Sequence, residues 1–181
     1  YAENIENPTV LARAIEHIAT KHVSLEIQPE QYPIVGENLL HSISEVLNVP
    51  FESELIAAWK AAYLQLADIL INAEKTKYDG LVAQNGGWAG WRNFNITQIE
   101  QADAGQVFVL QAADEHAVLA AEAGQFISVK VKVPNHNLEQ PHQFVVVSGL
   151  DGQYQFMVKG EENRTEYSVA NILLEHYKVG D

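Results

Sequence analysis

Three residues far apart in the sequence, His22, Tyr32 and Glu74, have side chains that together could hold a metal-containing group. A histidine that ends one amphipathic helix and faces the start of another can bind the iron of a haem. A carboxylate that accepts the second N–H of such an imidazole makes it a more electron-donating ligand, and a tyrosine hydroxyl can fix the same tautomer. The combination favours activation of bound oxygen over reversible storage.

Each of the three residues also has a simpler interpretation. His22 could end its helix and interact only with the helix dipole. Tyr32 could be a half-buried aromatic residue of a helix, and Glu74 a solvated charge paired with Lys75 or Lys77. The three residue types taken together favour a shared site, provided that the helices carrying them pack against one another.

Helical patterns carry all three side chains, and they predict helices over residues 8–21, 29–47 and 50–83. The second and third begin at Pro29 and Pro50, where a first-turn proline is tolerated and acidic residues follow. Apolar residues recur at helical spacing, which for the second helix gives Tyr32, Val35, Leu39, Ile43, Val46 and Leu47. This pattern predicts core helices, and packing of the first two on the third would bring the site together.

A glycine- and tryptophan-rich stretch at residues 85–92 interrupts the helical pattern, and the apolar period then drops towards two. The pattern predicts strands over residues 93–99, 106–111, 125–133, 142–148 and 154–159, followed by a short helix over 169–177. Strands at this spacing are typical of a small antiparallel barrel. We therefore expect a helical domain over 1–84, a linker over 85–92 and a β domain over 93–181.

Composition excludes several function classes. A net charge of −13, with only 11 lysines and arginines, disfavours nucleic acid or an anionic membrane surface as a partner. The chain has no cysteine, so it has no disulfide, thiolate metal site or cysteine nucleophile. No apolar run approaches the roughly 20 residues needed to cross a bilayer, and we expect a cytoplasmic protein.

The sequence around His22 is distinctive. Lys21-His22 is followed by residues 27–32 and 34–40, and later by Ala58-Trp59 and residues 61–63. This stretch closely resembles the bacterial flavohaemoglobins, the nitric oxide dioxygenases. Residues 86–92 resemble the connection from their globin to their ferredoxin-reductase-type FAD domain, and residues 124–131 resemble an early strand of that domain. The resemblance covers essentially the whole chain.

The resemblance implies a multidomain fold, α then β. Residues 1–84 would be the C-terminal portion of a globin domain, a partial globin fold of three helices. Residues 93–181 would be an incomplete ferredoxin-reductase-type antiparallel β-barrel that binds FAD. We expect an internal fragment that begins partway along the helix over the distal haem face and stops before the nicotinamide-binding domain.

The resemblance also implies roles for individual residues. His22 would be the proximal ligand of haem b, with Tyr32 and Glu74 as its hydrogen-bonding partners in catalysis. Lys21 would lie near the meeting point of the haem and flavin domains, or be a solvated cation at the helix end. Three apolar residues would line the proximal haem face, although each is equally well explained as core: Ile18, Ile27 and Val35.

In this family NAD(P)H reduces FAD, FAD reduces the haem iron, and nitric oxide reacts with iron-bound oxygen to give nitrate. The resemblance therefore implies nitric oxide detoxification, with nitric oxide and oxygen as the small-molecule substrates and a monomeric protein. NAD(P)H would bind through a domain absent from this chain, so we expect the chain as given to be incomplete and inactive alone. A further alternative is that the chain is a sequencing or gene-model fragment that has no stable fold of its own.

The flavin motif departs from the family pattern. The sequence His142-Gln143-Phe144-Val145 replaces the family's Arg-x-Tyr-Ser. Histidine is shorter than arginine and mostly neutral near pH 7, so contact with the FAD phosphates should weaken. Phe144 can still stack on a flavin ring but lacks the hydroxyl of tyrosine, and Val145 lacks that of serine. Alternatively, Phe144 and Val145 are barrel core without a ligand.

Loss of the flavin contacts leads to a second functional hypothesis. The protein would then be a non-enzymatic haem globin, a gas sensor or a nitric oxide sink, with a degenerate flavin domain. The resemblance therefore implies FAD as a cofactor at an altered motif, whereas haem b is expected from the site of His22, Tyr32 and Glu74.

Overall fold

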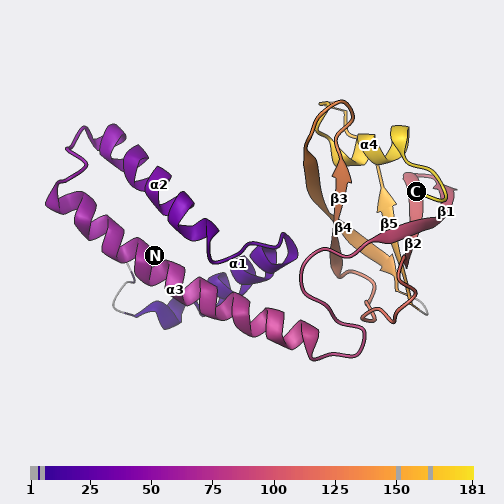
Figure 1. The fold of residues 1–181 in the computed structure, drawn as a ribbon, viewed down its shortest axis with the longest axis horizontal. Helices are drawn as coiled ribbons and strands as arrows, with labels where there is room; N and C mark the ends of the chain where they lie inside the picture. The colour runs from indigo at the N-terminus through magenta and orange to yellow at the C-terminus, as the bar shows by residue number, and fades with distance from the viewer. Residues whose placement is uncertain (1–3, 5–6, 150–151, 163–164) are drawn as a thin grey trace. The chain divides into compact units, whose positions relative to one another are not determined.

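The structure is a computed structural model of the 181-residue chain, and it describes residues 4, 7–149, 152–162 and 165–181. The chain divides into two compact units, Tyr1–Gly80 and Leu81–Asp181 (Figure 1). The first unit holds the helices that carry His22, Tyr32 and Glu74, and the second holds the sheet. The domain assignments made from the sequence, 1–84, 85–92 and 93–181, stay predictions.

Within the residues that the structure describes from position 7 onwards, the helical unit contains a short 3-10 helix and three α-helices: η2 (Pro8–Leu11), α1 (Ala12–Ser24), α2 (Gln31–Leu47) and α3 (Glu54–Val82). Helices α2 and α3 begin shortly after the prolines that were expected to open them. Pro29 and Pro50 lie in turns instead, since their carbonyls accept the backbone N–H groups of Tyr32 and Ser53. In the part of the chain that the structure describes, no helix combines the length and the apolarity needed to cross a membrane.

Helix α2 lies along α3 (Figure 1), and the two helices meet around Gly36. A Cβ atom added at Gly36 would lie 2.4 Å from Cε1 of Tyr63, so only glycine lets the Tyr63 ring come this close. Next to this contact a small core forms from three buried residues and the partly buried residues around them: Tyr32, Ala67 and Leu70, with Ile15, Ile27, Tyr63, Leu66 and Ile71.

The predicted core stripe of α2 was correct at Tyr32 and wrong in its phase from Val35 onwards. The residues that α2 buries are Tyr32, Gly36 and Leu40, which follow one another at four-residue spacing. The neighbouring row, which was expected to be core, is exposed: Val35, Leu39, Val46 and Leu47. Val46 is 82% exposed. A shift of one residue rotates a helix face by about 100°, which is why the apolar pattern alone selected the wrong row.

The second unit is built on a five-stranded antiparallel sheet with strand order β1-β2-β5-β4-β3. Its elements are β1 (Phe94–Ala102), β2 (Gly105–Ala112), β3 (Phe126–Lys132), β4 (Glu139–Ser148), β5 (Gln153–Val158) and α4 (Val169–His176). All five predicted strands and the short helix are present. Within the described residues β1 and β3 are the edge strands, so the sheet is open where a complete barrel would be closed.

The core of the second unit is aromatic at its centre. Phe108 and Phe156 are fully buried with ring centroids 5.8 Å apart, and Phe144 packs on Phe156 at 4.8 Å. Burial of each such ring contributes about 1.5–3 kcal/mol. Helix α4 lies against strands β3, β4 and β5 and adds apolar side chains to the core, while the Ser168 hydroxyl caps its first turn by accepting the N–H of Asn171.

The predicted linker is held to the sheet unit at its C-terminal end. The Arg92 guanidinium donates two hydrogen bonds to the Asp114 carboxylate, at 3.0 and 2.5 Å, and others to the carbonyls of His116 and Ala117. It also lies over the Trp88 ring, 5.3 Å from the centroid. The hydrogen bond from Arg92 holds the pKa of Asp114 well below its ordinary value. These contacts fix residues 88–92 as part of the second unit.

Candidate functional site

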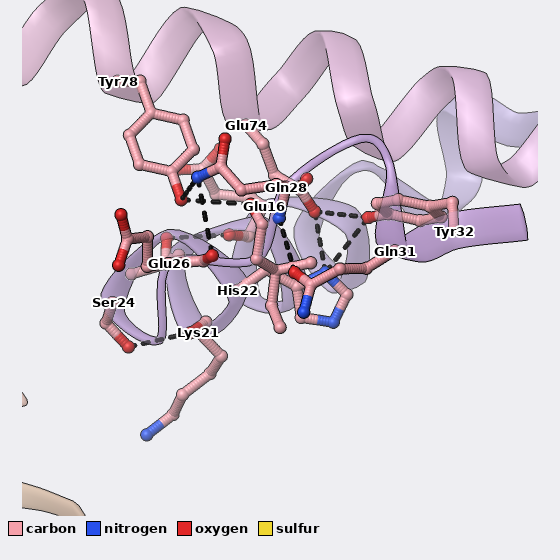
Figure 2. Close-up of polar contacts among 12 residues, drawn as sticks. Glu16, Lys21, His22, Ser24, Glu26, Gln28, Gln31, Tyr32, Glu74 and Tyr78 are labelled. Carbon is pink, nitrogen blue, oxygen red and sulfur yellow. Dashed lines mark hydrogen bonds and ion pairs between the residues drawn. The ribbon is translucent and has the colours of Figure 1, made fainter. Parts of the chain in front are cut away.

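His22 lies in the last turn of α1, and its ring points towards α2 and α3 (Figure 2). Its carbonyl accepts the backbone N–H groups of Leu25 and Ile27, each at 3.0 Å, which ends the helix and starts the turn to α2. The side chain is 32% exposed. The imidazole is therefore held by the protein on one side and open on another.

Tyr32 and Glu74 meet the His22 ring at Nδ1. This nitrogen lies 2.7 Å from Oε1 of Glu74 and 3.1 Å from the Tyr32 hydroxyl oxygen. The Tyr32 hydroxyl donates to the same Glu74 oxygen at 2.5 Å. Burial, followed by the hydrogen bond to Glu74 and the charge of its carboxylate, raises the pKa of Tyr32 far above its ordinary value, so the hydroxyl keeps its proton. The three predicted residues thus form one connected set.

Glu74 is not a surface charge. It is only 2% exposed, and it is the one acidic residue with a fully buried side chain among those described. Lys75 pairs with Asp79, and Lys77 pairs with Glu16, so neither lysine is its partner. A buried carboxylate is costly unless donors surround it. Here the donors are His22 and Tyr32, both on Oε1, while Oε2 has no hydrogen-bond partner within the described residues.

Two further tyrosines of α3 support this set, and the sequence did not identify either as functional. The Tyr63 hydroxyl donates to the carbonyl of Tyr32 at 2.6 Å, and the Tyr78 hydroxyl donates to the carbonyl of Ile27 at 3.1 Å. Tyr63 was noted only as part of residues 61–63, which carry the family resemblance. The signal for Tyr78 is its position four residues after Glu74, since residues at that spacing share a helix face.

The four other residues predicted around the haem lie in different surroundings. Ile27 packs against the small core of the helical unit. Ile18, one turn before His22, and Val35, on α2, are 37% and 57% exposed, so the core interpretation was wrong for both. Lys21 extends away from Glu74 and Tyr32 (Figure 2), and its carbonyl accepts the Ser24 hydroxyl. A ligand face formed by Ile18 and Val35 stays a prediction.

The geometry around His22 fits a haem ligand. Both hydrogen bonds of the ring in the described structure use Nδ1, which leaves Nε2 as the nitrogen that can bind a metal. A carboxylate on the opposite ring nitrogen fixes the tautomer and the ring orientation and raises the basicity of the ligating nitrogen. Glu74 is buried, and within the described residues its hydrogen bonds go to His22 and Tyr32 alone. The site can therefore present an oriented, electron-rich imidazole.

The four positions of the altered flavin motif lie in different surroundings. Phe144 is 6% exposed and lies in the sheet core against Phe156, so its ring has no free face for stacking. His142 is exposed and packs on Phe144 at 4.8 Å, and Gln143 is half-buried opposite Ser128. Val145 is 62% exposed, so it is not core as the alternative held. Phe144 follows the core interpretation, whereas flavin contacts of His142, Gln143 and Val145 stay predictions.

Known relatives match both units of the chain. The globin family matches residues 1–70. The flavohemoprotein of Rhizobium meliloti strain 1021 is 43% identical over 185 residues, and that of Bordetella pertussis strain Tohama I is 41% identical over 185 residues. Each alignment covers 100% of this chain and 46% of the relative. The chain therefore spans about half the length of the curated relatives that it matches.

A solved structure is similar over almost the whole chain. The flavohemoglobin of Malassezia yamatoensis, whose crystal structure contains bound FAD and heme, matches 94% of this chain and 42% of its own, with a TM-score of 0.78 and 26% sequence identity. The predicted fold class, a partial globin fold followed by a partial ferredoxin-reductase-type antiparallel β-barrel, is confirmed by this similarity and by the globin match, with the described strands forming an open sheet.

Proposed function

We propose that this chain, which resembles bacterial flavohemoproteins from end to end, binds haem b through Nε2 of His22 and takes part in the conversion of nitric oxide and oxygen to nitrate. The observation that carries the proposal is the buried carboxylate of Glu74, which lies 2.7 Å from the other nitrogen of the same ring. Few structural reasons other than ligand orientation would place a carboxylate there.

The residues of the chain would act by positioning and by charge. A bound haem would supply redox-active iron for the reaction of oxygen with nitric oxide. Glu74 would hold the proton on Nδ1 of His22 and increase electron donation from Nε2. Tyr32 would donate a hydrogen bond to the same carboxylate and hold it in place, because the raised pKa of its hydroxyl keeps the proton on the oxygen at neutral pH.

The source of electrons distinguishes two candidate functions. The flavohemoprotein relatives and the solved flavohemoglobin, which holds FAD and heme, support haem and FAD as the cofactors of the first candidate. This candidate is an oxidoreductase that would take its electrons from NAD(P)H. The burial of Phe144 favours the second candidate, a non-enzymatic haem globin that binds gas or removes nitric oxide without its own flavin. In both candidates the site of His22 binds the haem, and we expect the protein to be a monomer.

The first experiment tests haem binding. We expect the native protein supplied with haem to show a haem absorption band that His22→Ala abolishes. His136→Ala is the matched control, because His136 also pairs with a carboxylate, Glu166 at 3.2 Å, but lies in the sheet unit. A His22→Ala protein with an unchanged spectrum would contradict the ligand assignment.

The second experiment tests the reaction. A full-length protein that contains this chain, supplied with haem, FAD and NAD(P)H, should produce nitrate in proportion to the nitric oxide consumed. Haem binding without nitrate formation, together with an FAD titration that shows no binding, would instead support the gas-binding globin.

A further inference from the structure

Tyr78 connects α3 to the turn that follows His22. It lies one helical turn after Glu74, and its hydroxyl donates to the carbonyl of Ile27 at 3.1 Å (Figure 2). The same hydroxyl accepts a hydrogen bond from Nε2 of Gln28 at 3.4 Å. Burial, followed by the charges of Glu26 and Glu74, raises the pKa of Tyr78 to about 12, so the donor stays protonated near neutral pH.

The turn that receives this bond is built on His22 itself. Its carbonyl accepts the N–H groups of Leu25 and Ile27, and Glu26 between them has a φ of 59°. A residue other than glycine in this left-handed conformation persists only where its surroundings stabilise it. The hydrogen bond from Tyr78 to Ile27 is a stabilising contact of this kind from outside the turn.

We infer that Tyr78 is a positioning residue for His22. Helix α3 holds His22 in two ways: Glu74 binds its imidazole, and Tyr78 binds the turn whose backbone closes on its carbonyl. Loss of the Tyr78 hydroxyl would leave the turn freer to move and would weaken the hydrogen bond between Nδ1 and Glu74. The inference rests on the proposed function, in which that hydrogen bond sets the strength of the haem ligand.

The first test needs no haem. In the haem-free native protein, Tyr78→Phe should increase amide hydrogen exchange of Leu25 and Ile27 about fivefold, the factor expected for one lost hydrogen bond. The proton on Nδ1 of His22, observed by NMR, should also exchange faster with solvent. Tyr154→Phe is the matched control, because the Tyr154 hydroxyl also donates to a carbonyl, that of Leu119 at 2.5 Å, in the other unit. It should change none of these signals.

The second test uses the haem-loaded protein and measures the iron–histidine stretching frequency, which a merely structural role of Tyr78 would leave unchanged. In the reduced protein Tyr78→Phe should lower this frequency. Glu74→Gln should lower it by more. Unchanged exchange of the Nδ1 proton and an unchanged frequency would overturn the inference. If the unmutated protein binds no haem, the proposed function fails, and the haem-free experiment still decides whether Tyr78 positions His22.

Discussion

Removal of the Tyr32 hydroxyl should weaken the helical unit more than removal of a comparable hydroxyl nearby. In the structure this hydroxyl donates to the buried Glu74 carboxylate at 2.5 Å, and Tyr32 is 8% exposed. A hydrogen bond to a charged acceptor contributes about 1.5–3 kcal/mol. Tyr32→Phe keeps the ring and its packing, so we expect the free energy of unfolding to fall by about 2 kcal/mol.

Tyr63→Phe is the control for this prediction. It removes a hydroxyl from the same helical unit, but that hydroxyl donates to a neutral acceptor, the carbonyl of Tyr32, at 2.6 Å. A neutral hydrogen bond contributes about 0.5–1.5 kcal/mol, so Tyr63→Phe should cost about 1 kcal/mol less than Tyr32→Phe. Both losses of unfolding free energy can be measured by urea unfolding of the haem-free protein. Circular dichroism at 222 nm reports this unfolding, because helices dominate the signal at that wavelength.

A double-mutant cycle tests the cause of the difference. Glu74→Gln keeps the shape of the side chain and removes its charge, so the cost of Tyr32→Phe should shrink in that background. We expect a coupling energy of about 1–2 kcal/mol between the two residues, in the range found for groups in direct contact. A coupling energy near zero, with equal costs for Tyr32→Phe and Tyr63→Phe, would refute the charge-assisted hydrogen bond.

Three further predictions concern stability and pH. Ser168→Ala should lower the stability of the sheet unit by about 1 kcal/mol, because α4 loses its N-cap; Ser168→Thr should retain most of it by urea unfolding. Gly36→Ala should lower the melting temperature, because a Cβ 2.4 Å from the Tyr63 ring forces the helices apart; an unchanged melting temperature would contradict that contact. Burial raises the pKa of Tyr154 from 10.0 to about 12. The protonated hydroxyl of Tyr154 therefore stabilises the fold fully below pH 10, and this contribution is lost as the pH rises from about 10 to about 12. The free energy of unfolding, measured at pH 9, 10 and 11, should fall less steeply with pH for Tyr154→Phe than for the unmutated protein.

The site of His22, Tyr32 and Glu74 could be predicted because each residue type has a specific chemical use and the helices that carry them are strongly patterned. The contributions of Tyr63 and Tyr78 could not, because both donate to backbone carbonyls of another element. A carbonyl acceptor has no residue type, so the one available sequence signal was the position of Tyr78 four residues after Glu74. The packing of the helices has to be known first.

The elements were easier to predict than the faces that they bury. Apolar residues occupy two adjacent rows of α2, and the sequence does not say that the row of Gly36 rather than that of Val35 faces α3. Strand β4 has the same ambiguity, because Phe144 is followed by three valines. In a continuous apolar run the sequence does not show which alternate residues face the core. The structure buries Phe144 and Val146 and exposes Val145, which removes the ring from the surface where a flavin contact was expected.

The central claim is that Nε2 of His22 binds haem iron while Glu74 holds Nδ1. Haem titration of the His22→Gly variant, with and without added imidazole, tests this claim most directly. The variant alone should lose the haem absorption band, and imidazole should restore it by entering the space left by the side chain. A band that persists in the variant without imidazole would contradict the claim.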